Sequence, residues 1–226
     1  MNIYDFTNSK MFDAFIELNR QMIERDLPKK QLIVVGGFAL MIHQIRDKKE
    51  ITDIDYVGGD LSYELQSLSD KVGIEYGLGT GWINNDLMLT GTSLEDLEYT
   101  TGPLHFLPAY DLEKLEINVL DEADLLKMKI ISVDTAISAV EFGGKLTRMK
   151  DFVDIIALLN HLNLDLDDLK KDEELSSLLI NEETFNYVDM YIKGGEQAIS
   201  AALISMQIDR LMQSKENIID LYEYEN

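Results

Sequence analysis

Two aspartates and two glycines carry the strongest chemical signal in the chain. Asp53 and Asp55 flank an isoleucine at the start of a predicted strand, and alternate residues of a strand share a face, so the two carboxylates point the same way. Two carboxylates this close repel each other unless a divalent cation lies between them, and Mg²⁺ prefers oxygen ligands. Gly36 and Gly37 lie between a predicted apolar strand and a predicted helix, where backbone N–H groups can bind phosphate. Metal and phosphate sites together indicate nucleotidyl transfer.

Each feature also has a purely structural interpretation. Gly36 and Gly37 can form a tight strand-to-helix turn that binds nothing, and Asp53 and Asp55 can be a solvated strand end. Either motif alone arises easily by chance in an acidic protein. Their order along a strand–helix–strand pattern favours the functional interpretation.

The elements that position these residues follow from hydrophobic periodicity and from glycine and proline breaks. They predict an α+β chain, with a small mixed-sheet core in residues 1–121 and an all-helical domain in residues 122–226. Residues 73–103 are glycine-rich and include a predicted loop around Trp82. The predicted strands are 31–35, 53–57, 104–110 and 115–120. The predicted helices are 8–26, 38–46, 61–72, 122–142, 149–163, 166–180, 182–193, 195–213 and 215–224.

The composition sets broad limits on the function. The chain has 226 residues, 46% of them hydrophobic, which is enough for a proper core. It contains no cysteine, which excludes disulfides, thiolate metal sites and cysteine nucleophiles, and fits a cytoplasmic protein. We expect no signal peptide and no membrane span, because no apolar run approaches the ~20 residues that a span needs.

The net charge of −22 is unevenly distributed. Residues 1–60 and 121–160 each carry −2, whereas residues 61–120 carry −8 and residues 161–226 carry −10. The segments with the motifs are therefore nearly neutral and the others strongly acidic. This charge favours solubility, and it opposes broad nucleic-acid binding, which depends on phosphate contacts with basic residues.

Four short segments together resemble a known family. They are residues 35–40, 52–55, 124–129 and 150–155. In these segments the chain resembles the polymerase-β-like nucleotidyltransferase superfamily, and more narrowly the AbiEii and MenT type toxins of type IV toxin–antitoxin systems. The chain departs from the usual pattern at Gly37, where a serine hydroxyl is more common.

The resemblance implies a set of site residues. Catalytic roles fall to Asp53, Asp55, Lys129 and Asp151, and Mg²⁺ or Mn²⁺ would bind Asp53 and Asp55. Contacts with a nucleoside triphosphate (NTP) would come from Gly36, Gly37, Arg46, Thr52 and Arg148, and the Lys129 amine would contact its phosphates.

Several of these residues have a competing interpretation. Glu116 is a candidate third metal carboxylate, but it also fits an exposed strand face. Lys129 could extend its amine to the surface, and Asp151 could stabilise a helix N-terminus. We interpret His43 as a structural hydrogen-bonding residue, and Trp82 as a core residue rather than part of a base pocket.

The expected function is transfer of a nucleoside monophosphate from an NTP to an acceptor hydroxyl, in a toxin or abortive-infection type enzyme. The acceptor could be a tRNA end, a protein or a small molecule such as a cationic aminoglycoside. The alternative is a degenerate nucleotidyltransferase fold that acts as a binding or antitoxin-like partner. Apolar stripes in residues 161–226 predict either packing as a helical lobe or a surface for a second copy or a basic antitoxin.

Overall fold

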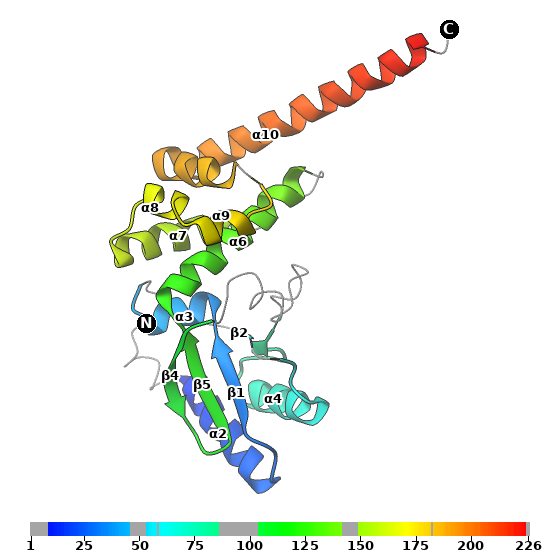
Figure 1. The fold of residues 1–226 in the computed structure, drawn as a ribbon. Coiled ribbons are helices and arrows are strands. Elements are labelled where there is room, and N and C mark those ends of the chain that lie inside the picture. Colours follow the sequence, from blue (N-terminus) through cyan, green and yellow to red (C-terminus); the bar gives the residue numbers. More distant parts are fainter. Residues whose placement is uncertain are drawn as a thin grey trace. The chain divides into compact units, whose positions relative to one another are not determined.

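The computed structural model describes residues 9–45, 53–57, 59–85, 104–141, 149–181 and 183–224. The chain divides into two compact units, Met1–Lys127 and Met128–Asn226, and each is described by itself (Figure 1). The division lies inside helix α6 (Glu122–Glu141). The chain is α+β, with a mixed sheet in the first unit and helices in the second.

The described part of the first unit is built on a five-stranded sheet with the order β3-β2-β1-β5-β4. Strand β1 runs antiparallel to β2 and parallel to β5. The outer strands are β3, parallel to β2, and β4, antiparallel to β5. Four strands fall where the sequence predicted them, and β3 lies in the predicted loop. The bounds are β1 (Lys30–Val34), β2 (Ile54–Val57), β3 (Ile83–Asn84), β4 (Phe106–Asp111) and β5 (Leu115–Leu120).

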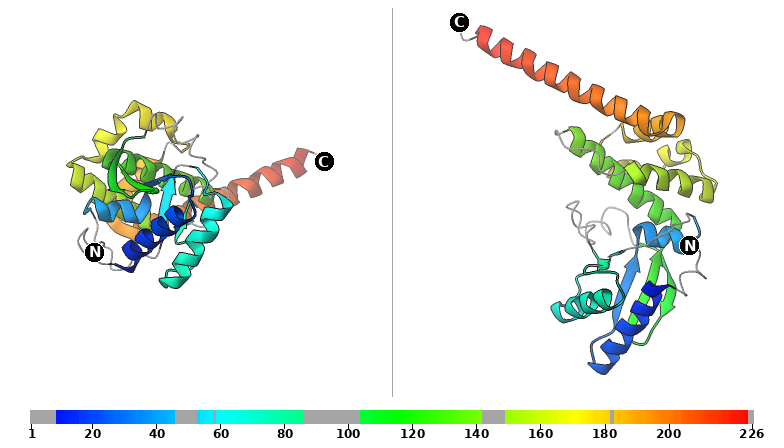
Figure 2. Two further views of the ribbon diagram at one scale, coloured as in Figure 1. Left: turned by 90° about the horizontal axis from the view of Figure 1, so that it is seen from below. Right: turned by 180° about the vertical axis from the view of Figure 1, so that it is seen from behind.

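Helices α2 (Lys10–Glu24) and α4 (Tyr63–Glu75) lie side by side against one face of this sheet (Figures 1 and 2). The Ser9 side chain begins α2 by accepting a hydrogen bond from the Phe12 amide at 3.3 Å. The inward side of α2 is apolar apart from Gln21, which is why it packs there. Its buried hydrophobic residues are Met11, Ala14, Phe15, Leu18 and Met22.

Trp82 anchors the core between these helices. Its side chain is 1% exposed, its ring lies 5.1 Å from that of Phe15, and its indole N–H donates to the Ser69 carbonyl at 2.8 Å. A Cβ on Gly73 would lie 2.3 Å from the indole, so only glycine leaves room for the ring at that point of α4. The interpretation of Trp82 as a core residue is confirmed.

The second unit consists of helices. The sequence predicted one helix over residues 166–180, but Asp172 caps a new helix there, accepting from the Leu175 amide at 2.9 Å. It also predicted a helix break at Gly194 and Gly195, and α10 is interrupted at Gly195, with φ +64°. The further break predicted near residue 214 is wrong, because α10 continues past it. The bounds are α7 (Met149–Leu162), α8 (Leu166–Lys170), α9 (Glu173–Leu178) and α10 (Thr184–Tyr224).

A buried carboxylate ties α6 to the start of α10. Asp134 is 1% exposed and accepts hydrogen bonds from the backbone amides of Ile180 and Asn181, both at 2.9 Å. It also accepts from the Thr184 hydroxyl at 2.6 Å. These donors satisfy a buried charge that would otherwise be costly.

Candidate functional site

The glycine turn and the aspartate pair meet in the structure. Gly36 begins α3 (Gly36–Ile42) with φ +62°, a conformation that favours glycine. The Val35 amide donates to the Asp55 carbonyl at 2.9 Å, which joins the end of β1 to the start of β2. A Cβ on Gly36 would lie 2.6 Å from Oδ2 of Asp55. The Asp55 carboxylate therefore packs directly against the turn.

The strand predicted at the aspartates is observed as β2, but it begins at Ile54, so Asp55 lies in the strand and Asp53 just before it. Ile54 is fully buried, whereas Asp53 is exposed and Asp55 is half-buried. The register of β2 and β3 places Asn84 beside Asp55. Because paired residues of neighbouring strands project to the same face, the Asn84 amide adds an oxygen near the carboxylates. The sequence did not reveal this pairing with Asp55, because β3 is too short to show periodicity.

Glu116 does not join this corner of the sheet. It pairs with Gln31 near the start of β1, whereas Asp55 bonds Val35 just past its end. Four residues of strand separate the two levels, or about 13 Å at ~3.3 Å per residue. Glu116 instead forms an ion pair with Lys29 at 3.1 Å. Hydrogen bonds from Asn118 and then Lys29 lower its pKa. The structure therefore does not bring Glu116, the candidate third metal carboxylate, together with Asp55.

Lys129 and Asp151 meet in the second unit, together with an acid that the sequence analysis did not select. The Lys129 Nζ lies 2.5 Å from Asp151 Oδ1 and 2.9 Å from Asp154 Oδ2. The Ser132 hydroxyl donates to the other oxygen of Asp151 at 3.0 Å. Asp154 follows Asp151 by three residues on α7, the spacing that places two side chains on one helix face. That spacing was the available signal for Asp154.

This cluster, which we call the lysine–aspartate triad (Lys129, Asp151 and Asp154), is almost completely buried. The side chains are 11%, 1% and 3% exposed, respectively. Burial lowers the pKa of the Lys129 amine, but the charges and hydrogen bonds of Asp151 and Asp154 raise it, and the net shift is upward. Lys129 is therefore charged and engaged within its own unit. The Asp151 carboxylate is bound by the side chains of Lys129 and Ser132 on α6. Asp151 therefore does more than stabilise the N-terminus of α7.

The other predicted residues divide into two groups. Gly37 follows Gly36 in the first turn of α3 and is half-buried. Arg46, Thr52 and Arg148 lie outside the residues that the structure describes. Of the predicted residues, the structure brings Gly36 together with Asp55 in the first unit, and Lys129 together with Asp151 in the second unit.

His43 has a structural environment, as expected. Its Nε2 lies 2.7 Å from the Leu120 carbonyl and its Nδ1 lies 3.0 Å from a Glu122 carboxylate oxygen. The ring thus connects α3 to the end of β5 and the start of α6. Both ring nitrogens are used, which leaves no nitrogen for a reacting group in this arrangement.

The oxygen donors near Gly36 fit Mg²⁺ in one of its usual modes. Mg²⁺ is commonly held by one or two carboxylates, with waters and substrate phosphates completing six ligands. Asp53 and Asp55 supply two such carboxylates at the surface. Within the described ranges, no group of three or more histidine, aspartate or glutamate residues is placed to hold a metal.

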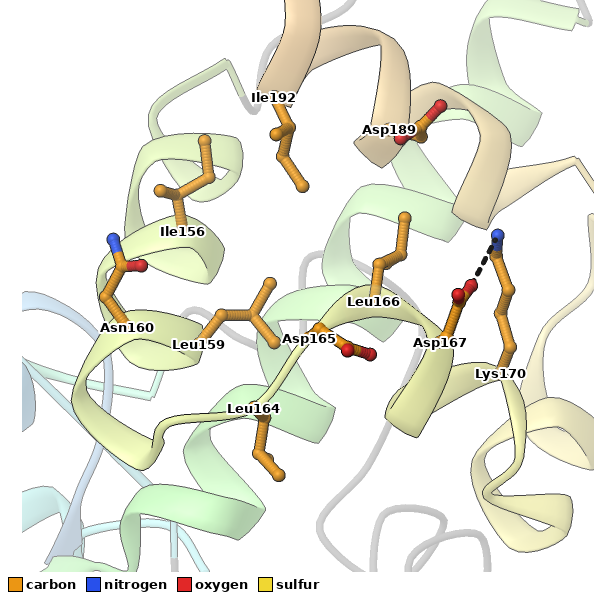
Figure 3. Close-up of a pocket in the computed structure, with 10 residues that line it drawn as sticks. All are labelled: Ile156, Leu159, Asn160, Leu164, Asp165, Leu166, Asp167, Lys170, Asp189 and Ile192. Carbon is orange, nitrogen blue, oxygen red and sulfur yellow. Dashed lines mark hydrogen bonds and ion pairs between the residues drawn. The ribbon is translucent and has the colours of Figure 1, made fainter.

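A groove of about 350 Å³ lies in the second unit between α7, α8 and α10 (Figure 3). Leu159, Leu166 and Ile192 form part of its apolar lining, and the Asp167–Lys170 ion pair of 3.5 Å lies at its edge. None of the predicted site residues lines this groove. We therefore locate the candidate chemistry at Gly36 and Asp55 rather than here.

No helix in the described ranges is long and apolar enough to cross a membrane. Comparisons of this chain with protein-family models, with curated proteins and with solved structures each found no match.

Proposed function

We propose that this protein is a metal-dependent nucleotidyltransferase that moves a nucleoside monophosphate from an NTP to an acceptor hydroxyl. One observation carries the proposal: the Asp55 carboxylate lies against Gly36, where a Cβ would come within 2.6 Å of its oxygen. A conformationally restricted glycine and a carboxylate pair, each of which is weak alone, thus form one corner of the sheet.

Each residue of this corner has a defined task in the proposal. Gly36 turns the chain with positive φ and leaves space for the Asp55 carboxylate. Asp53 and Asp55 hold the metal at the start of β2, and Asn84 lies beside Asp55 as a neutral oxygen or N–H contact for substrate. When bound, Mg²⁺ supplies charge neutralisation of the triphosphate and activation of the acceptor hydroxyl.

We assign the lysine–aspartate triad a positioning role in this proposal. Its lysine is 11% exposed and already ion-paired with two carboxylates. A direct contact with the triphosphate would require Lys129 to leave those acids unpaired in a buried place, which is costly. Holding α7 against α6 is therefore the role that burial and charge support best, in place of the phosphate contact expected from the sequence.

The acceptor is proposed from charge. The net charge of −22 repels long polyanions and attracts cations. This favours a small cationic acceptor or a protein side chain over a large RNA. A toxin or abortive-infection role belongs to the same proposal, since it follows from the resemblance of the four sequence segments.

The test combines NTP binding with label transfer. The purified protein is titrated with each NTP with and without Mg²⁺ by calorimetry. It is then incubated with α-labelled NTPs and fractionated cell extract, and label is followed into RNA, protein and small molecules. We expect Mg²⁺-dependent binding and label in one fraction, both lost in Asp55→Asn. The matched control is Asp13→Asn, an exposed aspartate on α2. Equal transfer by Asp55→Asn and the wild type would defeat the proposal.

A further inference from the structure

The last part of α10, from Glu196 to Tyr224, has two apolar faces. Gly195, with φ +64° and ψ −160°, breaks the helix before it. One face is already covered by the second unit. Ile199 and Leu203 are 0% and 5% exposed, and the Met206 sulfur accepts a hydrogen bond from the Tyr187 hydroxyl at 3.3 Å.

The opposite face is exposed. Ile204, Ile208 and Met212 are 57%, 51% and 59% exposed. They are spaced by four residues, so they form one stripe along the helix. Figures 1 and 2 show this part of α10, orange to red, continuing past the other helices of its unit. Large apolar side chains in such a row indicate a binding surface rather than scattered exposure.

The sequence extends this stripe in the pattern of a coiled coil. Positions alternate by three and four residues, which is the a and d spacing that lets one helix wrap around another. We call these positions the seam. They are Ala201, Ile204, Ile208, Leu211, Lys215, Ile218 and Tyr222. The seam is about 32 Å long at 1.5 Å per residue, and six of its seven residues are uncharged.

The positions that flank the seam identify the partner. In a coiled coil the e and g positions flank the seam and select the partner by charge. In this chain none of them is charged, although the segment is acidic. The e and g residues are Ser200, Ser205, Gln207, Met212, Ser214, Ile219 and Leu221. Acidic flanks would select a basic partner and would repel an identical helix, so neutral flanks favour self-association.

Lys215 decides the orientation. It is the charged residue of the seam. In a parallel, in-register pair, two copies of Lys215 would face each other, which is unfavourable. In an antiparallel pair centred between residues 209 and 210, each Lys215 lies opposite Ile204 of the second copy, and each Ile208 lies opposite Leu211. We propose that the seam of α10 forms an antiparallel helix pair with a second copy of this chain.

The first experiment measures mass in solution. Light scattering and sedimentation of the full chain should show a species of twice the 25.8 kDa monomer mass at micromolar concentration. We expect the double variant Ile204→Ala/Ile208→Ala to raise the dimer dissociation constant at least about tenfold, or ~1.4 kcal/mol. Asp209→Ala, an exposed position outside the seam, is the matched control and should leave it unchanged. Circular dichroism checks that each variant is folded.

The second experiment measures orientation. Because the chain has no cysteine, Gln197→Cys gives a single site for a spin label. An antiparallel pair places the two labels about 38 Å apart along the axis by helix rise, and a parallel pair places them within about 10 Å. A monomer up to ~100 µM, or a dimer that the alanine pair does not weaken, would overturn the proposal. A short label distance would overturn the antiparallel arrangement. Association that occurs only after a basic protein is added would overturn self-association and would show that the seam binds a different partner.

Discussion

The chain places aspartates in two contrasting environments. At the corner of the sheet, Asp53 is exposed and Asp55 is half-buried against Gly36. In the second unit, Asp151 and Asp154 are buried and ion-paired with Lys129. A buried charge must be neutralised from within the protein, whereas a surface carboxylate can be reached by a cation from solvent. Burial thus separates carboxylates that hold a fold together from carboxylates that can serve a ligand.

Removing a carboxylate at the sheet corner should have the largest effect. We expect Asp53→Ala or Asp55→Ala to reduce nucleotidyl transfer by about 10³-fold or more, since loss of the metal removes several kcal/mol of transition-state stabilisation. The melting temperature should change little, because neither side chain is fully buried. If transfer persists in these variants, or if the variants unfold, then Asp53 and Asp55 are not the ligand-binding carboxylates that the comparison requires.

Removing the cation of the triad should destabilise the protein. Lys129→Met leaves two buried carboxylates unpaired, and we expect it to lower the free energy of unfolding by about 3–5 kcal/mol. Lys193→Met is the control, because Lys193 forms an exposed pair with Asp189 at 2.6 Å and should cost only ~0.5 kcal/mol or less. Urea titration measures both. A similar small loss in both variants would contradict a structural role for the triad.

The triad should also give a signature at high pH. The pKa of Lys129 is raised on folding above its usual value of 10.5, so the folded state binds this proton more tightly than the unfolded state. The stabilisation is complete below pH 10.5 and is lost as the pH rises through the raised value. We expect the urea midpoint of the wild type to fall more steeply above pH 10.5 than that of Lys129→Met. Parallel curves for the two proteins would show that Lys129 does not contribute.

Two glycines allow the contact with Asp55 to be isolated. Gly36 and Gly59 both have positive φ, at +62° and +76°, but a Cβ on Gly59 would meet nothing within 4 Å. Gly59→Ala should therefore cost only the backbone strain of about 1–2 kcal/mol. Gly36→Ala should cost more and should weaken Mg²⁺-dependent NTP binding, because the methyl group displaces the Asp55 carboxylate. Equal effects of the two substitutions on stability and binding would argue against a site at this turn.

The smallest effect should come from Glu116. Its pair with Lys29 is partly exposed, and such pairs contribute little because water and salt screen them. We expect Glu116→Gln to leave transfer unchanged and to leave the urea midpoint nearly unchanged. A large loss of transfer in Glu116→Gln would support a role for Glu116 as a metal ligand.

The sequence predicted those parts of the site that depend on local spacing. The opposite burial of Ile54 and Asp55 follows from the strand period of two, and the Gly36 turn follows from its position between strand and helix. Glu116 shows the limit of this reasoning. The strand period gives the face on which a residue lies, but its level along the sheet depends on the register between strands, which no local pattern contains.

The remaining differences also arise from contacts between distant residues. Strand β3 has two residues, Ile83 and Asn84, and exists because it pairs with β2. The sequence shows Lys129 and Asp151 in the expected order on two helices. That they form an ion pair depends on how α6 packs against α7, which the sequence does not show. In the sequence, Asp172 is typical of an acidic helix interior. Its role as the cap of α9 depends on a hydrogen bond from the Leu175 amide that only the structure shows.

The buried carboxylate of Asp134 has a consequence for the order in which the second unit assembles. It accepts the amides of Ile180 and Asn181, which lie between α9 and α10 outside any helix. Solvent protection of these two amides therefore depends on α6 being formed and in place. They should exchange their hydrogens as slowly as helical amides nearby, and they should lose that protection together when α6 detaches. A connecting segment thus reports, amide by amide, on the cooperative opening of the helices that it joins.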